Sequence, residues 1–311
     1  MKDLELQERI DQTAASNHLV IADFNVMLWK ILDFYGRHEY LFKREENRIA
    51  LIKLGVSYIF NKGPIGLNNS QARVIVIADN RAAKYGGYWR HYEVARDVRI
   101  KEAWDSFRPK TKLRNYKDGR GDKSELFYKA FKIAKEYCET YLSFYEFEGF
   151  EADDIAGAIY RNLKDKHRVK IFYTVDRDWA QLVKEEDGWY WYTPRVSKPN
   201  EWFLDQAMKN EDVIYYAERK LDYPGLEHPC QLINAKVEAG DLGDNLPPGT
   251  PAIYMDLINP HEQYCIEKLF SEKFNKLILD CECEEPNANS EHLAECDKMF
   301  KKLKLSFNFL G

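Results

Sequence analysis

Short apolar runs rich in valine and isoleucine recur along this chain, and an acidic residue follows several of them. Leu19-Val20-Ile21-Ala22 is followed by Asp23, and the run 74–78 is followed by Asp79. Runs of this length and composition are typical of buried strands in a parallel sheet. Because stretches with helical periodicity separate them, the chain is expected to fold as an α/β protein with a mainly parallel central sheet flanked by helices.

The acids that follow these runs are expected to converge, since ligands of open α/β sheets bind beyond the carboxyl ends of the strands. The candidates are Asp23, Asp79, Glu151, Asp153, Asp154, Asp176, Asp178, Asp241 and Asp244. Carboxylates packed together repel unless a cation neutralises them, and hard oxygen ligands favour Mg²⁺ or Mn²⁺. The sequence predicts a site for two such ions, the arrangement used for phosphodiester cleavage. Asp153 and Asp178 could instead cap helices, but capping does not account for the ordered series.

The periodicities predict two regions. Residues 1–204 are expected to form the α/β domain that carries the metal site, and residues 205–311 a mainly helical region that completes the site. The expected strands are 18–25, 73–79, 143–148, 168–175 and 189–192. The expected helices are 26–60, 125–142, 151–163 and one that opens at 178.

Residues 81–124 differ from the rest of this acidic chain because they are basic and aromatic, with two glycine clusters. A solvated charged helix would explain them. A local basic excess between two groups of candidate metal ligands favours instead an arch or loop that contacts phosphates. The net charge of −5 argues against a protein coated in positive charge, but it does not exclude a nucleic-acid ligand.

The composition also bears on location and on zinc. No run is long enough to span a membrane and no signal peptide is evident, so a cytoplasmic protein with reduced thiols is expected. Cys281, Cys283, His292 and Cys296 could be interpreted as a zinc site, but the gap between the first two is tighter than usual. Both cysteines could instead be ordinary strand residues after Leu277-Ile278-Leu279-Asp280.

Three segments carry a family resemblance. They are Gly149-Phe150-Glu151-Ala152-Asp153-Asp154, Thr174-Val175-Asp176-Arg177-Asp178-Trp179-Ala180-Gln181-Leu182 and Gly240-Asp241-Leu242-Gly243-Asp244-Asn245. In their order and spacing they resemble the bacterial and phage 5′ nucleases, which include flap endonucleases and 5′–3′ exonucleases such as the 5′-nuclease domain of DNA polymerase I. Asp79-Asn80 followed by Gly87-Tyr88-Trp89-Arg90 is similar to the ribonuclease H branch of the T-even bacteriophages. The resemblance covers roughly residues 18–250 and implies the PIN-like fold of this family.

The resemblance implies a role for each matching residue. Asp23, Asp79, Glu151 and Asp153 match the first metal group; Asp153, Asp176, Asp178 and Asp244 match the second, with Asp154 and Asp241 nearby. Family members grip the scissile phosphate with a lysine and an arginine, and Tyr116-Lys117-Asp118-Gly119-Arg120 fits that pattern. Lys117 and Arg120 are therefore the first candidates, with Lys84, Arg90 and Arg99 as rivals.

The chain departs from the family after Asn245. Most members continue with a glycine-rich turn that opens a duplex-binding element, whereas here Leu246-Pro247-Pro248-Gly249 follows. The way in which a duplex would be anchored is therefore left open.

The implied function is a metal-dependent 5′–3′ exonuclease or flap endonuclease that also removes RNA primers (ribonuclease H activity) in phage DNA replication. A monomer in a bacterial or phage-infected cell is expected, acting on DNA and RNA–DNA duplexes, with a single-stranded-DNA-binding protein or clamp as a further partner. The alternatives are a PIN-type ribonuclease and a non-catalytic structure-specific binder. The balance between RNA and DNA substrates, and between exonuclease and endonuclease cleavage, stays open.

Overall fold

The structure is a computed structural model of the chain. The described residues are 18–37, 52–53, 72–107, 125–164, 168–193, 207–241, 244, 246–258, 266–285 and 298.

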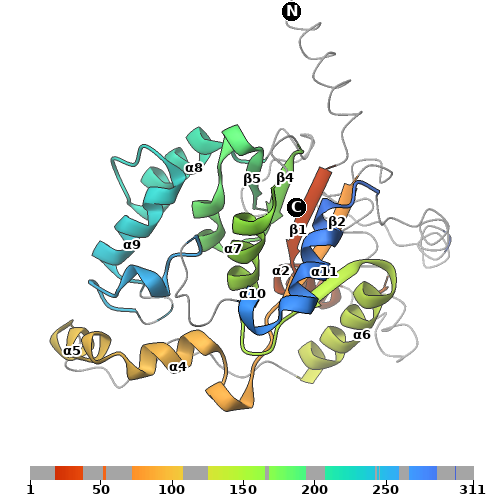
Figure 1. Cartoon of the computed structure of the whole chain (residues 1–311), viewed down its shortest axis with the longest axis horizontal. Coiled ribbons are helices and arrows are strands. Elements are labelled where there is room, and N and C mark those ends of the chain that lie inside the picture. Colours follow the sequence, from red (N-terminus) through yellow and green to blue (C-terminus); the bar gives the residue numbers. More distant parts are fainter. Residues whose placement is uncertain are drawn as a thin grey trace, which may run out of the picture.

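Five parallel strands form the central sheet, in the order β3-β2-β1-β4-β5 (Figure 1). The strands are β1 His18–Asp23, β2 Ala72–Ala78, β3 Ser143–Glu146, β4 Lys170–Tyr173 and β5 Trp189–Tyr192. The strand order runs outward in opposite directions from β1 and β4, so a topological switch point lies between these two neighbours. A crevice at such a point is the usual ligand site of an open α/β sheet. The predicted α/β class with a parallel sheet is confirmed.

Helices connect the strands and cover both faces of the sheet. They are α2 Phe24–Arg37, α4 Trp89–Arg96, α5 Val98–Phe107, α6 Glu125–Tyr141, α7 Ala152–Asn162, α8 Asn210–Tyr216, α9 Leu232–Ala239, α10 Ile266–Leu269 and α11 Ser271–Glu282. A 3₁₀ helix, η3, spans Arg177–Leu182, where the sequence predicts the start of an α-helix. Strand β1 ends at Asp23, two residues before the end of the predicted first strand, and helix α2 begins at Phe24.

The core has a layer on each face of the sheet because alternate residues of a strand point to opposite sides. In β1, Val20 and Ala22 pack with α2 and α6, whereas Leu19 and Ile21 pack with α7 and α11. The C-terminal helix α11 therefore buries its apolar side in the same core as the first strand. The proposed division of the chain at residue 204 stays a prediction.

The described part of the basic segment 81–124, residues 81–107, is mainly helical. Tyr88 leads into α4, and α5 follows directly after Asp97. Trp104 of α5 packs with Tyr254 and Met255 in a separate apolar cluster, and the Tyr254 hydroxyl donates to Asp97 Oδ2 at 3.1 Å. The two helices thus reach across to the segment 246–258. Residues 108–124 lie outside the described residues, so the arch hypothesis for them stays a prediction.

The expectation of strand residues around Cys281 is wrong. Cys281 lies in helix α11, and Cys283 follows the end of that helix. Burial raises the pKa of the Cys281 thiol well above its ordinary value. His292 and Cys296 lie outside the described residues, and the described cysteines are free thiols.

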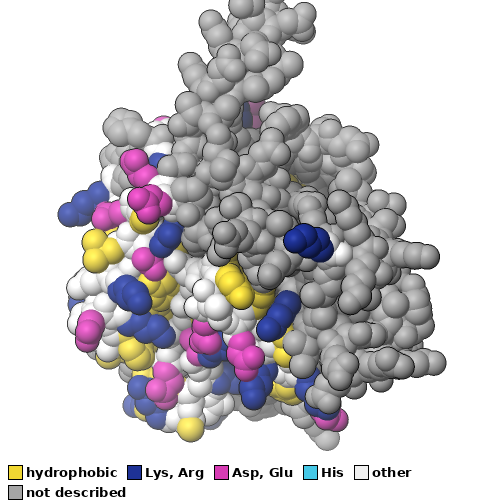
Figure 2. All heavy atoms as spheres, turned by 90° about the vertical axis from the view of Figure 1, so that its right-hand side faces the viewer, with side chains coloured by type: hydrophobic (Ala, Val, Ile, Leu, Met, Phe, Trp, Pro, Cys, Tyr) yellow, Lys and Arg dark blue, Asp and Glu magenta, His cyan; other side chains and the backbone are white. Residues whose placement is uncertain are grey.

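Two further properties concern the length of the described helices and the charge of the described surface. None of the helices within the described ranges is both long and apolar enough to cross a membrane. Figure 2 shows acidic and basic side chains intermixed on the described part of one face, which agrees with the modest net charge of −5.

Gly157 in α7 gives a prediction about stability. A Cβ atom at this position would lie 2.1 Å from the carbonyl oxygen of Leu257, which also accepts a hydrogen bond from Arg161 at 2.7 Å. We expect Gly157→Ala to destabilise the protein by about 1–3 kcal/mol, because backbone must shift to relieve the overlap. Helix propensity alone predicts the opposite sign, a gain of about 1 kcal/mol. Urea unfolding therefore decides the question, and a more stable variant would show that α7 does not pack against Leu257.

Candidate metal centre

The candidate acids share the carboxyl edge of the sheet. Asp23 ends β1, Asp79 follows β2, Glu151 caps the helix after β3, and Asp176 follows β4. Thr174 lies just beyond β4, and its hydroxyl donates to Asp23 Oδ2 at 2.9 Å. The sequence therefore brings acids from four strand ends to one edge, beside the switch point between β1 and β4.

Asn25 holds the first two acids in place. Its backbone N–H donates to Asp23 Oδ1 and its side-chain amide donates to Asp79 Oδ2, both at 2.8 Å. The other Asp79 oxygen accepts the backbone N–H of Ala152, at the start of α7, at 2.8 Å. Asn25 and Thr174 were missed by reasoning from the sequence. A polar residue two positions after Asp23, at the entry of a helix, was the available signal for Asn25.

Burial and the nearby charge of Asp79 raise the pKa of Asp23 to about 7. The folded protein therefore binds a proton at Asp23 that the unfolded chain releases near its ordinary pKa of about 4. Without divalent ions, we expect stability to fall as the pH rises from about 4 to above 7, by up to about 4 kcal/mol from this group. Urea unfolding in EDTA across this range, with Asp23→Asn as the reference, measures it. Identical pH profiles for the two proteins would refute the shift.

Three further acids crowd the first turn of α7. Glu151, Asp153 and Asp154 each offer a carboxylate oxygen, and these oxygens lie within 4.8 Å of one another. The helix start favours acids because its N–H groups carry partial positive charge. Two backbone N–H groups of this turn donate to these acids: Glu151 N–H to Asp154 Oδ2 at 3.0 Å and Asp154 N–H to Asp153 Oδ1 at 2.8 Å.

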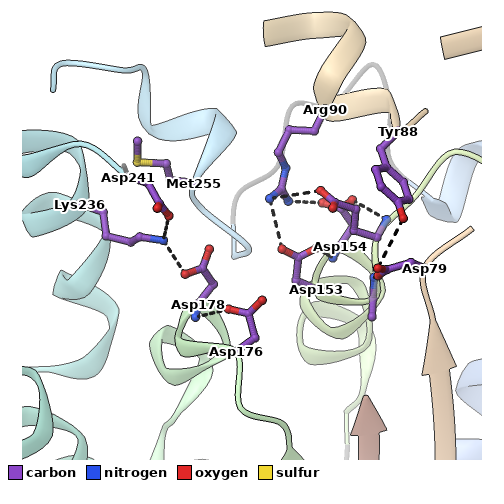
Figure 3. A network of polar contacts seen from close by, with 12 residues as sticks. Asp79, Tyr88, Arg90, Asp153, Asp154, Asp176, Asp178, Lys236, Asp241 and Met255 are labelled. Carbon is purple, nitrogen blue, oxygen red and sulfur yellow. Dashed lines mark hydrogen bonds and ion pairs between the residues drawn. The ribbon is translucent and has the colours of Figure 1, made fainter. Parts of the chain in front are cut away.

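Arg90 of α4 brings a positive charge to these acids. Its side chain is 4% exposed, and Nη1 lies 3.2 Å from Asp153 Oδ2 and 3.9 Å from Glu151 Oε2. Nη2 forms a short ion pair with Asp154 Oδ1 (Figure 3). The sequence-based hypothesis made Arg90 a rival phosphate contact, whereas in the structure it lies against the acids.

A second group of acids surrounds Lys236 of α9. Its Nζ lies 2.5 Å from Asp178 Oδ1 and 2.6 Å from Asp241 Oδ2. Burial by itself would lower the pKa of Lys236, but the two carboxylates outweigh it and raise that pKa well above the ordinary value. Sequence reasoning missed Lys236, since a single lysine in a helix carries no distinctive signal.

A tight turn places Asp241 and Asp244. Asp241 and Leu246 exchange two backbone hydrogen bonds of 2.8 Å, and the Asp244 N–H donates to the carbonyl of Asp241 at 3.2 Å. Gly240 precedes the turn with φ +76°, and a Cβ there would lie 2.7 Å from the Leu246 carbonyl oxygen. The glycine that opens the third motif is thus required by this close approach.

The two groups face each other. Figure 3 shows Asp153 and Asp178 on opposite sides of the space between α7 and η3. Burial is the main cause that raises the pKa of Asp178; Lys236 opposes it, while the charges of Asp241 and Asp153 add to it. Asp176 is exposed at the start of η3, where it accepts the Asp178 N–H at 3.0 Å. Asp178 of the second group is therefore close enough to Asp153 of the first for their charges to interact, and a shared metal site stays a prediction.

The other predicted basic residues that the structure describes, Lys84 and Arg99, have different contacts. Lys84 is exposed, and its ammonium lies 4.8 Å from the centre of the Tyr85 ring. Exposed Arg99 pairs with Asp97 at 2.6 Å. Lys117 and Arg120 lie outside the described residues, so their role stays a prediction.

Comparisons with known proteins find similar sequences and folds. Residues 88–213 match the family model described as the 5′-3′ exonuclease, N-terminal resolvase-like domain. DNA polymerase I of Chloroflexus aurantiacus is 32% identical over 133 residues, which are 42% of this chain and 13% of the polymerase. The chain thus spans only a small part of the length of this relative.

Two solved structures are similar over most of the chain. The bacteriophage T5 D15 protein co-crystallised with metal ions is 16% identical, with a TM-score of 0.45, over 93% of this chain and 100% of that one. A variant of the T5 D15 flap endonuclease, in a complex with DNA and metal ions, is 18% identical, with a TM-score of 0.47, over 92% and 98%.

Proposed function

We propose that this chain, whose residues 88–213 match the family model of the 5′-3′ exonuclease N-terminal domain, is a metal-dependent 5′ nuclease. The observation that carries the proposal is the meeting of acids from four strand ends at the switch point of the sheet. Hydrolysis of phosphodiester bonds at 5′ ends or flaps of duplex DNA is the reaction that these acids and the family relationship support best.

The acids fit divalent ions. Carboxylate oxygens are the ligands that Mg²⁺ and Mn²⁺ prefer. The crowded acids at the start of α7 already bind one cationic group, the guanidinium of Arg90. The proposed first set is Asp23, Asp79, Glu151 and Asp153; the second is Asp153, Asp176, Asp178 and Asp244, with Asp154 and Asp241 beside them. Bound ions would supply a water of lowered pKa and stabilise the leaving oxygen.

The protein's own groups would orient this chemistry. Asn25 and the N–H of Ala152 fix the two oxygens of Asp79, and Thr174 fixes Asp23. Lys117 and Arg120 are proposed to grip the scissile phosphate, because they match the family pattern. The C-terminal region beyond residue 204 is proposed to contact the duplex.

The finer parts of the proposal concern the substrate. We propose activity on RNA–DNA hybrids as well as on DNA flaps, as the resemblance to the T-even phage branch implies, in a phage replication setting. A single-stranded-DNA-binding protein or clamp as partner, a monomeric state and a cytoplasmic location belong to the same proposal.

Product sizes test the function. A 5′-labelled flap and a 5′-labelled RNA–DNA hybrid are incubated with the protein in Mg²⁺ and in EDTA. Short products released from the 5′ end in Mg²⁺ alone support a 5′ nuclease. Cleavage of single-stranded RNA without need of a 5′ end would indicate a PIN-type ribonuclease, and tight binding without any product would indicate a structure-specific binder.

A further inference from the structure

We propose that Arg90 is an internal counter-ion that competes with the divalent cation. In the metal-free protein its guanidinium neutralises the acids at the start of α7, and it has to withdraw from them when a metal ion binds. The inference rests on the proposed function only in taking these acids as metal ligands.

Competition follows from shared oxygen atoms. Arg90 contacts Asp153 Oδ2 at 3.2 Å and forms the short pair with Asp154 Oδ1. A magnesium ion needs carboxylate oxygens at about 2.0–2.1 Å, in a strict geometry. A guanidinium on the same oxygens uses the lone pairs that the metal would take, and the two positive charges repel.

Contacts of the neighbouring residues hold Arg90 in this position. The neighbouring Trp89 donates its N–H to the carbonyl of Gly149 at 2.7 Å, and its ring stacks on Phe150 with 6.3 Å between centres. Gly149 and Phe150 lead directly to Glu151, so the start of α4 is bonded to the loop that presents the acids. A Cβ on Gly149 would lie 2.5 Å from the Tyr85 ring, so this loop and the segment before α4 are in close contact.

The crowding of the acids explains why the protein needs such a residue. Three carboxylates with oxygens within 4.8 Å of one another lose hydration on burial and repel. An arginine is always charged and offers a planar set of donors, so it can serve several carboxylates at once. The protein can thereby fold before metal is bound, at the cost of weaker metal binding.

Titration of metal-free protein with Mg²⁺ by isothermal calorimetry tests the inference. We expect Arg90→Gln to bind Mg²⁺ at least about tenfold more tightly than wild type, because a like charge beside the ion is removed. Arg96→Gln is the matched control: Arg96 is an exposed arginine on the same helix that contacts Tyr92, and its affinity should stay that of wild type.

Melting curves give a readout that is independent of catalysis. Without metal, Arg90→Gln should melt at a lower temperature than wild type, because buried carboxylates lose their partner. Added Mg²⁺ should raise its melting temperature more than that of wild type, since the ion replaces the missing charge. Arg96→Gln should show neither change.

Arg90→Lys decides the question if Arg90→Gln does not fold without metal. Lysine keeps the charge but cannot span two carboxylates, so its Mg²⁺ affinity should lie above that of wild type. Equal or weaker Mg²⁺ binding by the folded Arg90 variants would overturn the inference and leave the proposed function intact. Failure of wild type and variants alike to bind Mg²⁺ would overturn both.

Discussion

Asp153→Asn is expected to slow cleavage at least about a hundredfold in Mg²⁺ while the fold survives. Asp153 Oδ2 lies 3.2 Å from Arg90 Nη1, and the charge of Asp153 contributes to the raised pKa of Asp178. Asp153 therefore lies where the two groups of acids meet. An asparagine keeps the shape but is a poorer ligand for a hard cation. Even residues that only support a metal ligand change affinity or activity by about 10–100-fold when mutated, so a lost ligand should cost more.

The measurement is single-turnover cleavage of a 5′-labelled flap, with circular dichroism as the check on folding. Glu136→Gln is the control, because Glu136 is an exposed acid on α6. It should cleave like wild type. Cleavage by folded Asp153→Asn at a near wild-type rate would remove Asp153 from the metal site.

Lys117→Ala and Arg120→Ala should each slow cleavage on the order of 10²–10³-fold, with little change in Mg²⁺ affinity. The reason is that each would lose charge stabilisation at the scissile phosphate, an effect of about this size for one well-placed donor. Arg90 lies among carboxylates at 4% exposure, so the two residues remain the preferred phosphate contacts. The binding of wild type to a flap should also weaken as salt rises, and each variant should reduce that salt slope by about 1.

Lys101→Ala on α5 is the control for a general loss of positive charge, since Lys101 is exposed. Its cleavage rate should stay within a few-fold of that of wild type. If Lys101→Ala is as slow as Lys117→Ala, the basic segment acts through its summed charge, and the assignment of a specific pair is wrong.

The strands and the family resemblance could be predicted because both depend on local patterns. The Val- and Ile-rich runs of β1 and β2 are buried on both faces, and their β-branched residues favour strand over helix. The match of residues 88–213 to the exonuclease family model supports the resemblance to the 5′ nucleases, and it contains the first two of the three motifs.

The helix around Cys281 was missed because a short apolar run is compatible with either a strand or a helix. Phe274, Leu277 and Cys281 are buried while Leu279 is exposed, and this spacing of three and four is the helical signal that the run itself obscured.

The partners of Arg90 and Lys236 could not be read from the sequence for a different reason. A basic residue can pair with a phosphate or with a carboxylate, and the packing of α4 and α9 against the site decides which one it contacts. The contact between Trp104 and the segment 246–258 is also long-range in the sequence, so no local pattern predicts it.

The hydrogen bond from Thr174 to Asp23 joins residues 151 positions apart, and the bond from Ala152 to Asp79 spans 73. Contacts between such distant segments form late, since the chain must first close long loops. The acid groups are therefore assembled only after β1 has found both of its neighbours. A cation that needs ligands from several strand ends would bind only after the sheet is complete, so the rate of its binding during refolding would report when the fold is completed.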